Sequence, residues 1–182
     1  MNNKKKILAI SGSTRERSTN LNLINAIAEL ASDTFDVNVY QGLMNLPPFN
    51  PDNDDENAGE AVADLRTQLK RSDGVLICTP EYAMGVPGTL KNAIDWTVSS
   101  ADFYRKPTAL ITASSSGEKG HASLLETLKV IDANITDQTQ LLISHAKLKV
   151  SKEYKITDDK TLIEIESLIR AFYKIIQNNS NI

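Results

Sequence analysis

Apolar residues occur along this chain in two patterns that alternate with each other. Largely apolar runs at residues 7–10, 75–79, 107–112 and 140–143 are typical of strands that are buried on both faces. Residues 35–40 alternate apolar and polar positions, which is typical of a half-exposed edge strand. The other segments repeat apolar residues at helical spacing and predict helices, which we place over residues 21–28, 58–71, 87–97, 120–131 and 159–176.

This alternation predicts a doubly wound α/β domain, in which helices cover both faces of a parallel sheet. The 182 residues are 41% hydrophobic and 24% charged, which fits a single domain with a sizeable core. No shift in composition marks a boundary within residues 1–182. A ligand site is expected at the carboxyl ends of the strands. The loops that follow these ends are residues 11–19, 80–86 and 114–120.

Charge and residue usage argue against several kinds of partner. A net charge of -3 argues against nucleic acid, which usually demands a basic face. Cys78, the single cysteine, lies in a buried run and predicts neither a disulfide nor a metal cluster. The acidic cluster Asp52, Asp54, Asp55 and Glu56 lacks the spacing of a calcium loop, so no metal site is predicted. Because no apolar run approaches the length of a signal peptide or a membrane span, we expect a cytoplasmic protein without membrane contact.

The loop from Ser11 to Asn20 concentrates hydroxyl, amide and guanidinium groups before a predicted helix. Unpaired backbone N–H groups and the positive end of the helix dipole favour an anion there. The loop matches neither G-x-x-x-x-G-K-[ST] nor G-x-G-x-x-G, so a phosphate monoester is favoured over a triphosphate or a dinucleotide. The alternative is an ordinary cap by Ser18 or Thr19 with two solvated arginines. A cap alone explains neither the Ser-Gly-Ser turn nor the arginine inside the loop.

The loops after the third and fourth predicted strands favour a site for a flat ring. Residues 79–88 are rich in Pro and Gly and expose backbone groups in a rigid arrangement. Tyr82 and Met84 add apolar surface there, although by default such residues would cover the core. Residues 113–120 are small and polar and allow close approach. One phosphate loop and two ring loops at the same sheet edge favour a mononucleotide, and FMN in particular.

Three segments resemble the NADPH-dependent FMN reductases of the flavodoxin-like superfamily, which include quinone, chromate and azo-dye reductases. Ser11 to Asn20 is similar to the family's Ser-Gly-Ser-x-Arg-x-x-Ser-x-Asn loop, residues 46–50 to its Pro-containing loop, and residues 80–96 to its flavin-ring loop and following helix. The resemblance implies a flavodoxin-like sandwich with a five-stranded parallel sheet in the order 2-1-3-4-5. Where the family often has a second glycine after Gly120, this chain has His121, which by default is a solvated group at a helix start.

The resemblance also implies which residues bind the cofactor. The phosphate loop contributes Ser11, Ser13, Arg15, Ser18, Thr19 and Asn20. The isoalloxazine is contacted by Pro80, Glu81, Tyr82, Ala83 and Met84, and its far side is closed by Ser115, Ser116 and Gly117. No dedicated catalytic acid or base is expected, because the flavin N5 itself accepts the hydride.

The implied activity is the ping-pong reduction of quinones, azo compounds, flavins or metal oxyanions with NADPH or NADH. Two alternatives remain open: a flavodoxin-type electron carrier, and a flavin-binding module with negligible turnover. Family members commonly place the active site beside a subunit interface, which implies a homodimer or homotetramer. We expect that interface on an apolar patch of Leu90, Ile94 and Trp96, unless Trp96 packs on its own sheet.

Overall fold

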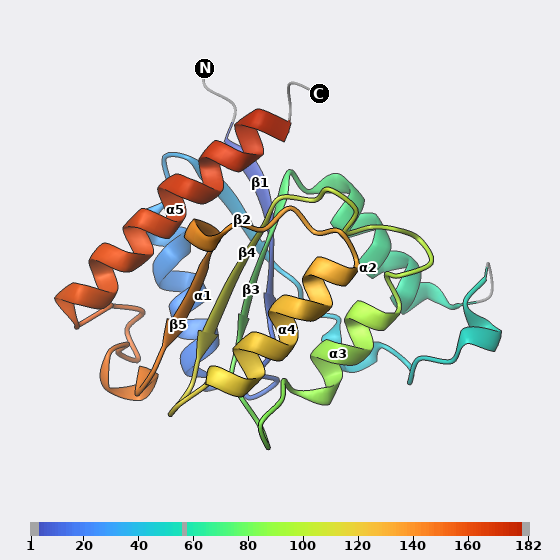
Figure 1. Ribbon diagram of the computed structural model, residues 1–182, viewed down its shortest axis with the longest axis horizontal. Coiled ribbons are helices and arrows are strands. Elements are labelled where there is room, and N and C mark those ends of the chain that lie inside the picture. The colour runs from blue at the N-terminus through green and yellow to red at the C-terminus, as the bar shows by residue number, and fades with distance from the viewer. Residues whose placement is uncertain (1–3, 56–57, 180–182) are drawn as a thin grey trace.

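The computed structural model describes residues 4–55 and 58–179. Its five parallel strands form one sheet in the order β2-β1-β3-β4-β5 (Figure 1), which confirms the flavodoxin-like order. The strands are β1 (Lys5–Ser11), β2 (Phe35–Val39), β3 (Gly74–Thr79), β4 (Thr108–Ala113) and β5 (Gln140–Ile143). Every residue of β3 and β4 is buried, whereas β2 at the sheet edge alternates exposed positions with buried or partly buried ones. The prediction of a strand buried on both faces is therefore confirmed for β3 and β4 but wrong for residues 140–143, because β5 is the other edge strand and only its Ile143 is buried.

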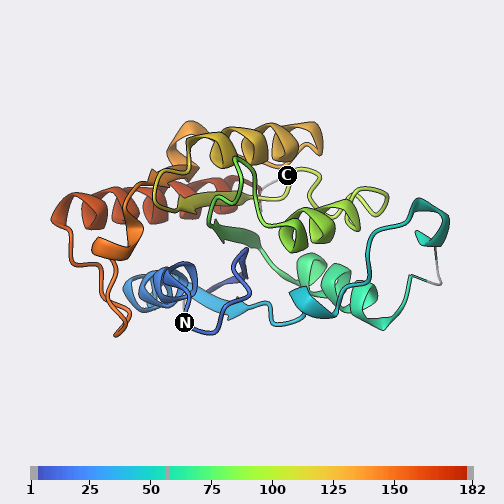
Figure 2. The same ribbon diagram turned by 90° about the horizontal axis from the view of Figure 1, so that it is seen from below.

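Helices cover both faces of the sheet (Figures 1 and 2). Successive side chains of a strand point to opposite faces. Ile7 and Ala9 of β1 therefore belong to one apolar core, while Leu8 and Ile10 belong to the other. The first core packs under α1 (Thr19–Leu30) and α5 (Asp159–Asn179), and the second under α2 (Glu60–Arg71), α3 (Gly88–Asp95) and α4 (Glu118–Val130).

The interface patch expected on α3 is wrong, because its residues are buried within the chain. Leu90, Ile94 and Trp96 are each at most 2% exposed. The segment after β2 covers the indole: Trp96 Nε1 donates a hydrogen bond to Pro47 O at 2.8 Å, and the Phe49 ring packs edge-on with 5.0 Å between ring centroids. The alternative interpretation, that Trp96 packs on its own sheet, is the correct one, since Trp96 belongs to the same apolar core as residues of β1 and β3.

No helix within residues 4–55 and 58–179 is long and apolar enough to cross a membrane. Over the same residues, no group of three or more His, Cys, Asp or Glu side chains is placed to bind a metal. In the acidic cluster noted in the sequence, Asp54 forms an ion pair with Arg66 at 2.5 Å. Glu56 of that cluster lies outside the described residues.

Candidate functional site

A cavity of about 380 Å³ lies at the carboxyl ends of the strands. The arrowheads in Figure 1 mark this edge of the sheet. The loops that follow β1, β3, β4 and β5 all contribute to its wall. This is the edge at which doubly wound sheets bind ligands. The cavity is lined by Ser13, Arg15, Ser18, Thr19, Asn20, Pro80, Glu81, Tyr82, Ala113, Ser114, Ser115, His145, Ala146, Lys147 and Leu148.

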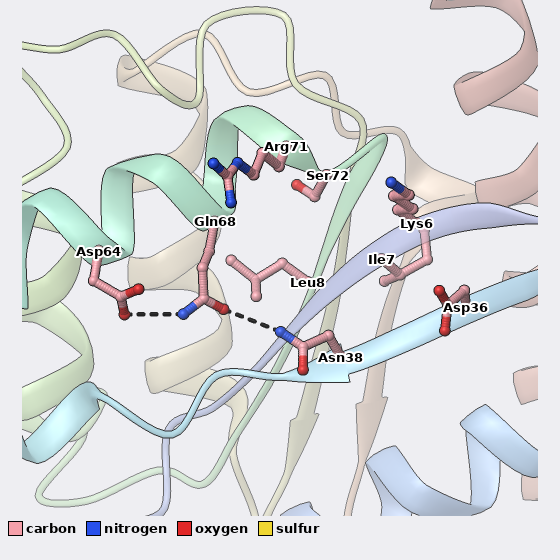
Figure 3. Close-up of a pocket in the computed structure, with 9 residues that line it drawn as sticks. All are labelled: Lys6, Ile7, Leu8, Asp36, Asn38, Asp64, Gln68, Arg71 and Ser72. Atoms are coloured by element: carbon pink, nitrogen blue, oxygen red, sulfur yellow. Dashed lines mark hydrogen bonds between the residues drawn. The ribbon is translucent and has the colours of Figure 1, made fainter.

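A larger cavity, of about 440 Å³, lies between α2 and the strands β1 and β2 (Figure 3). Polar side chains in its wall already bond to one another, since Gln68 donates to Asp64 at 2.9 Å and accepts from Asn38 at 3.0 Å. None of the predicted site residues lines this cavity. We therefore place the functional site at the carboxyl edge, where position and chemistry agree, and not in the larger cavity.

The first loop forms a cradle at the start of α1. Ser18 is the N-cap of this helix, and its Oγ accepts a hydrogen bond from Asn20 N at 3.2 Å. Ser11 Oγ donates to Ser13 O at 3.0 Å and stabilises the turn before the helix. One hydroxyl satisfies one of the unpaired N–H groups at a helix start. Ser18 therefore caps α1 as an acceptor, which leaves its O–H group able to donate to an anion together with the other groups at this helix start.

Two contacts fix this loop against the neighbouring strands. Gly12 N donates to Cys78 O at 2.9 Å, and a Cβ at Gly12 would lie only 2.3 Å from Thr79 Oγ1. The Asn20 side chain donates from Nδ2 to Ala113 O at 3.2 Å, and its Oδ1 accepts from Cys78 Sγ at 3.3 Å. Burial raises the pKa of the Cys78 thiol, as expected for a core cysteine. Asn20 therefore positions the loop through its amide.

The second loop is a tight hairpin. Tyr82 and Gly85 exchange backbone hydrogen bonds of 2.8 and 2.9 Å across a two-residue turn. The turn residues Ala83 and Met84 have φ of 49° and 64°, a left-handed conformation that is strained for residues with a Cβ. Tyr82 and Met84 are 49% and 75% exposed, so neither covers the core. The hairpin thus presents apolar surface at the ligand edge.

Glu81 joins the second loop to the third. Its Oε2 accepts a hydrogen bond from Gly120 N at 2.6 Å, where the positive end of the α4 dipole favours a carboxylate. A Cβ on Gly120 would lie 2.9 Å from Gly85 O, so this close approach requires glycine.

Most of the predicted site residues line the cavity. The exceptions are Ser11, Ala83, Met84, Ser116 and Gly117.

Sequence reasoning missed the loop after β5. His145, Ala146, Lys147 and Leu148 all line the cavity. His145 N donates to Ser115 O at 3.2 Å, and this bond ties the loop to the one that follows β4. The rule that ligands bind beyond the carboxyl ends of strands, applied also to residues 140–143, would have identified this segment.

His121 lies outside the cavity and is not the solvated group that was expected. It is half-buried, with Nδ1 2.9 Å from Thr112 Oγ1 and Nε2 3.1 Å from Gln140 Oε1. The imidazole therefore links α4 to β4 and β5. Burial lowers the pKa of His121, and the hydrogen bond with Gln140 opposes this effect in part.

Because burial disfavours protonated His121 in the folded chain, we expect the free energy of unfolding of the protein to decrease as the pH is lowered. This contribution is complete above the unfolded-state pKa of about 6.5 and is lost as the pH drops below it, with a slope of at most about 1.4 kcal/mol per pH unit for one proton. Urea denaturation between about pH 7 and 5 measures the slope. His121→Gln, which does not titrate, should flatten it, and equal slopes in both proteins would contradict the assignment.

The strand order and the cavity at the carboxyl edge define a flavodoxin-like α/β protein. The chain belongs to the NADPH-dependent FMN reductase family, which matches residues 5–147. It is 31% identical to a quinone reductase of Escherichia coli K12, over 97% of this chain and 98% of that protein. It is also 31% identical to an NADPH azoreductase of Bacillus sp. OY1-2, over 82% of this chain and 92% of that protein. The solved structure of a flavoenzyme, the NAD(P)H:(acceptor) oxidoreductase of Paracoccus denitrificans, matches this chain with a TM-score of 0.82 and 26% sequence identity. The match covers 96% of this chain and 98% of that protein.

FMN, the cofactor of this family, fits the residues that are present. The hydroxyls of Ser13 and Ser18, the Arg15 guanidinium and the start of α1 form a donor set for a phosphate dianion. The half-exposed Tyr82 ring offers apolar surface to a flat ring system. Both kinds of group lie in the wall of the same cavity.

Proposed function

We propose that this protein is an FMN-dependent NAD(P)H oxidoreductase that reduces quinones, azo compounds, flavins or metal oxyanions. The observation that carries the proposal is that four strand-end loops converge on one cavity, which combines an anion cradle with an exposed aromatic ring. Bound FMN supplies hydride acceptance at N5 and onward electron transfer. The named activities of the two relatives support this class of reaction.

In this proposal the chain's own residues bind and orient. Ser13, Arg15, Ser18 and Thr19 hold the phosphate, and Ser11, which the resemblance also assigns to it, supports their turn through its bond to Ser13 O. Residues 80–84 and 115–117 flank the ring, as the family resemblance implies. Asn20 and Glu81 keep the loops in place through their bonds to Ala113 and Gly120. We assign no residue as a catalytic acid or base.

The test is steady-state oxidation of NADPH or NADH with an added quinone, combined with the flavin content of the purified protein. We expect about one FMN per chain, because the four loops share one cavity, and turnover that depends on the quinone. FMN without turnover would favour the electron carrier or the non-catalytic module. Release of FAD, or no bound flavin after reconstitution, would contradict the phosphate cradle.

We expect ping-pong kinetics with a loose choice of acceptor. One site over the flavin would serve donor and acceptor in turn, and the exposed side chains of Tyr82 and Met84 would offer an acceptor mainly apolar contacts. Apolar contacts select by only about 1–3 kcal/mol per distinguishing group, so several quinones should compete. Double-reciprocal plots for NAD(P)H and a quinone should be parallel. Intersecting plots would require a separate nicotinamide pocket.

We also propose a homodimer or homotetramer located in the cytoplasm. The oligomer rests on the family resemblance, because the patch first expected on α3 is buried. Val98 and Val130, which are 53% and 82% exposed, line a groove between α3 and α4 and offer apolar surface for contact between copies. Cys78 is buried and unpaired, which suits a reducing compartment.

A further inference from the structure

Lys147, in the loop after β5, lines the same cavity as Arg15 and the N-cap Ser18. We propose that its ammonium group binds a phosphate monoester at this site. Two ligands of the reaction carry such a group: FMN at its 5′-phosphate and NADPH at its 2′-phosphate. The inference rests on the proposed phosphate site at the start of α1. It assigns to the same site a positively charged residue from the loop after β5, which the sequence analysis did not include.

The backbone that carries Lys147 is fixed on both sides. Ala146 is 2% exposed, and its N–H donates to Ser114 O at 3.0 Å in the loop after β4. Further along, Ser151 O accepts a hydrogen bond from Asn22 Nδ2 of α1 at 3.1 Å. These contacts hold the segment between the loop after β4 and the first turns of α1, and so keep Lys147 in the wall of the cavity that Arg15 and Ser18 also line.

The charges around the cavity favour an anion. Arg15 and Lys147 are cations in its wall, and the positive end of the α1 dipole adds to them. Glu81 is the one carboxylate among the lining residues, and it already accepts the bond from Gly120 N. Within the described parts of the chain, Lys147 is in no ion pair with a carboxylate. A bound dianion would relieve the repulsion between these positive groups.

The segment around Lys147 also carries an excess of positive charge. Residues 147–155 contain four lysines and one glutamate, in a chain whose net charge is -3. Lys147 is the one of these lysines that lines the cavity. Lys152 belongs to the same segment but is not a lining residue, which makes Lys152→Gln a matched control for Lys147→Gln.

The experiment compares Lys147→Gln, Lys152→Gln and the unchanged protein in two assays. Flavin fluorescence titration of the apoprotein gives the Kd for FMN and for riboflavin, which lacks the phosphate. Kinetics of the FMN-loaded protein give KM for NADPH and for NADH, which lacks the 2′-phosphate. We expect Lys147→Gln to weaken the phosphorylated member of one pair about fivefold or more, with little change for its unphosphorylated counterpart. The effect should shrink with added salt.

A selective loss for FMN assigns Lys147 to the cofactor phosphate, and a selective loss for NADPH assigns it to the 2′-phosphate. The inference is wrong if Lys147→Gln behaves like Lys152→Gln in both assays. It is also wrong if Lys147→Gln weakens the binding of riboflavin as much as that of FMN and raises the KM for NADH as much as that for NADPH. The proposed cradle is tested separately by replacing Arg15 and Ser18. A cradle variant that loses FMN, beside a Lys147→Gln protein that behaves like the control, would overturn this inference alone.

Discussion

Replacing Arg15 and Ser18 together by alanine is expected to weaken FMN binding at least tenfold while the fold survives. The double change removes a guanidinium and a hydroxyl from the cradle at the start of α1. One hydrogen bond to a charged group is worth about 1.5–3 kcal/mol, and about 1.4 kcal/mol corresponds to a tenfold change in Kd. Titration of the apoprotein with FMN, followed by flavin fluorescence, measures the loss.

The single variants separate binding from stability. Ser18→Ala also removes the N-cap of α1, which should lower the free energy of unfolding by about 1 kcal/mol. Arg15→Ala should leave the Tm unchanged, because Arg15 is exposed and bonds only weakly to Arg17 O at 3.4 Å. Riboflavin is the control ligand, since its affinity should change little. An unchanged Kd for FMN in the double variant would contradict the phosphate site and show that Ser18 acts only as a helix cap.

Gly12→Ala is expected to destabilise the chain by about 1–3 kcal/mol and to impair FMN binding as well. The added Cβ would lie 2.3 Å from Thr79 Oγ1 and 2.8 Å from Thr79 Cβ, and the Thr79 side chain is fully buried. Relief requires the loop after β1 to move away from β3, which breaks the bond from Gly12 N to Cys78 O. Urea denaturation measures the free energy of unfolding.

Gly88→Ala is the matched control for this change. Gly88 is the first residue of α3, and a Cβ there would meet nothing within 4 Å. Its effect should stay within about 0.5 kcal/mol, as for other substitutions that disturb no packing. Equal losses in the two variants would show that the contact with Thr79 is not the cause.

The order of elements could be predicted from the sequence because buried strands and covering helices leave different apolar spacings. Residues 75–79 form a run without exposed positions, and β3 is buried throughout. Boundaries were less exact: β4 extends to Ala113, and α3 begins at Gly88 after Pro87 in an extended conformation. Apolar spacing marks the middle of an element, whereas local hydrogen bonds decide its ends.

Partners between distant positions could not be predicted. Asn20 and Glu81 were recognised as polar residues of the ligand edge, but their side chains bond to Ala113 O and Gly120 N, which lie 93 and 39 residues away in the sequence. Residue type shows that a side chain can form a hydrogen bond, but it does not show whether the partner is a ligand or the protein. The strained turn at Ala83 and Met84 carried no signal either, since glycine or asparagine normally marks such a conformation.

The burial of Cys78, whose thiol donates to Asn20 Oδ1, makes this residue resistant to electrophiles. Quinones and related acceptors are electrophiles that add to thiolates, the reactive form of cysteine. The chain's only cysteine lies two residues before Pro80 in the site, yet it is 0% exposed and burial raises its pKa. The thiol therefore stays protonated and enclosed at the end of β3. At this position the protein is therefore protected from alkylation by quinones.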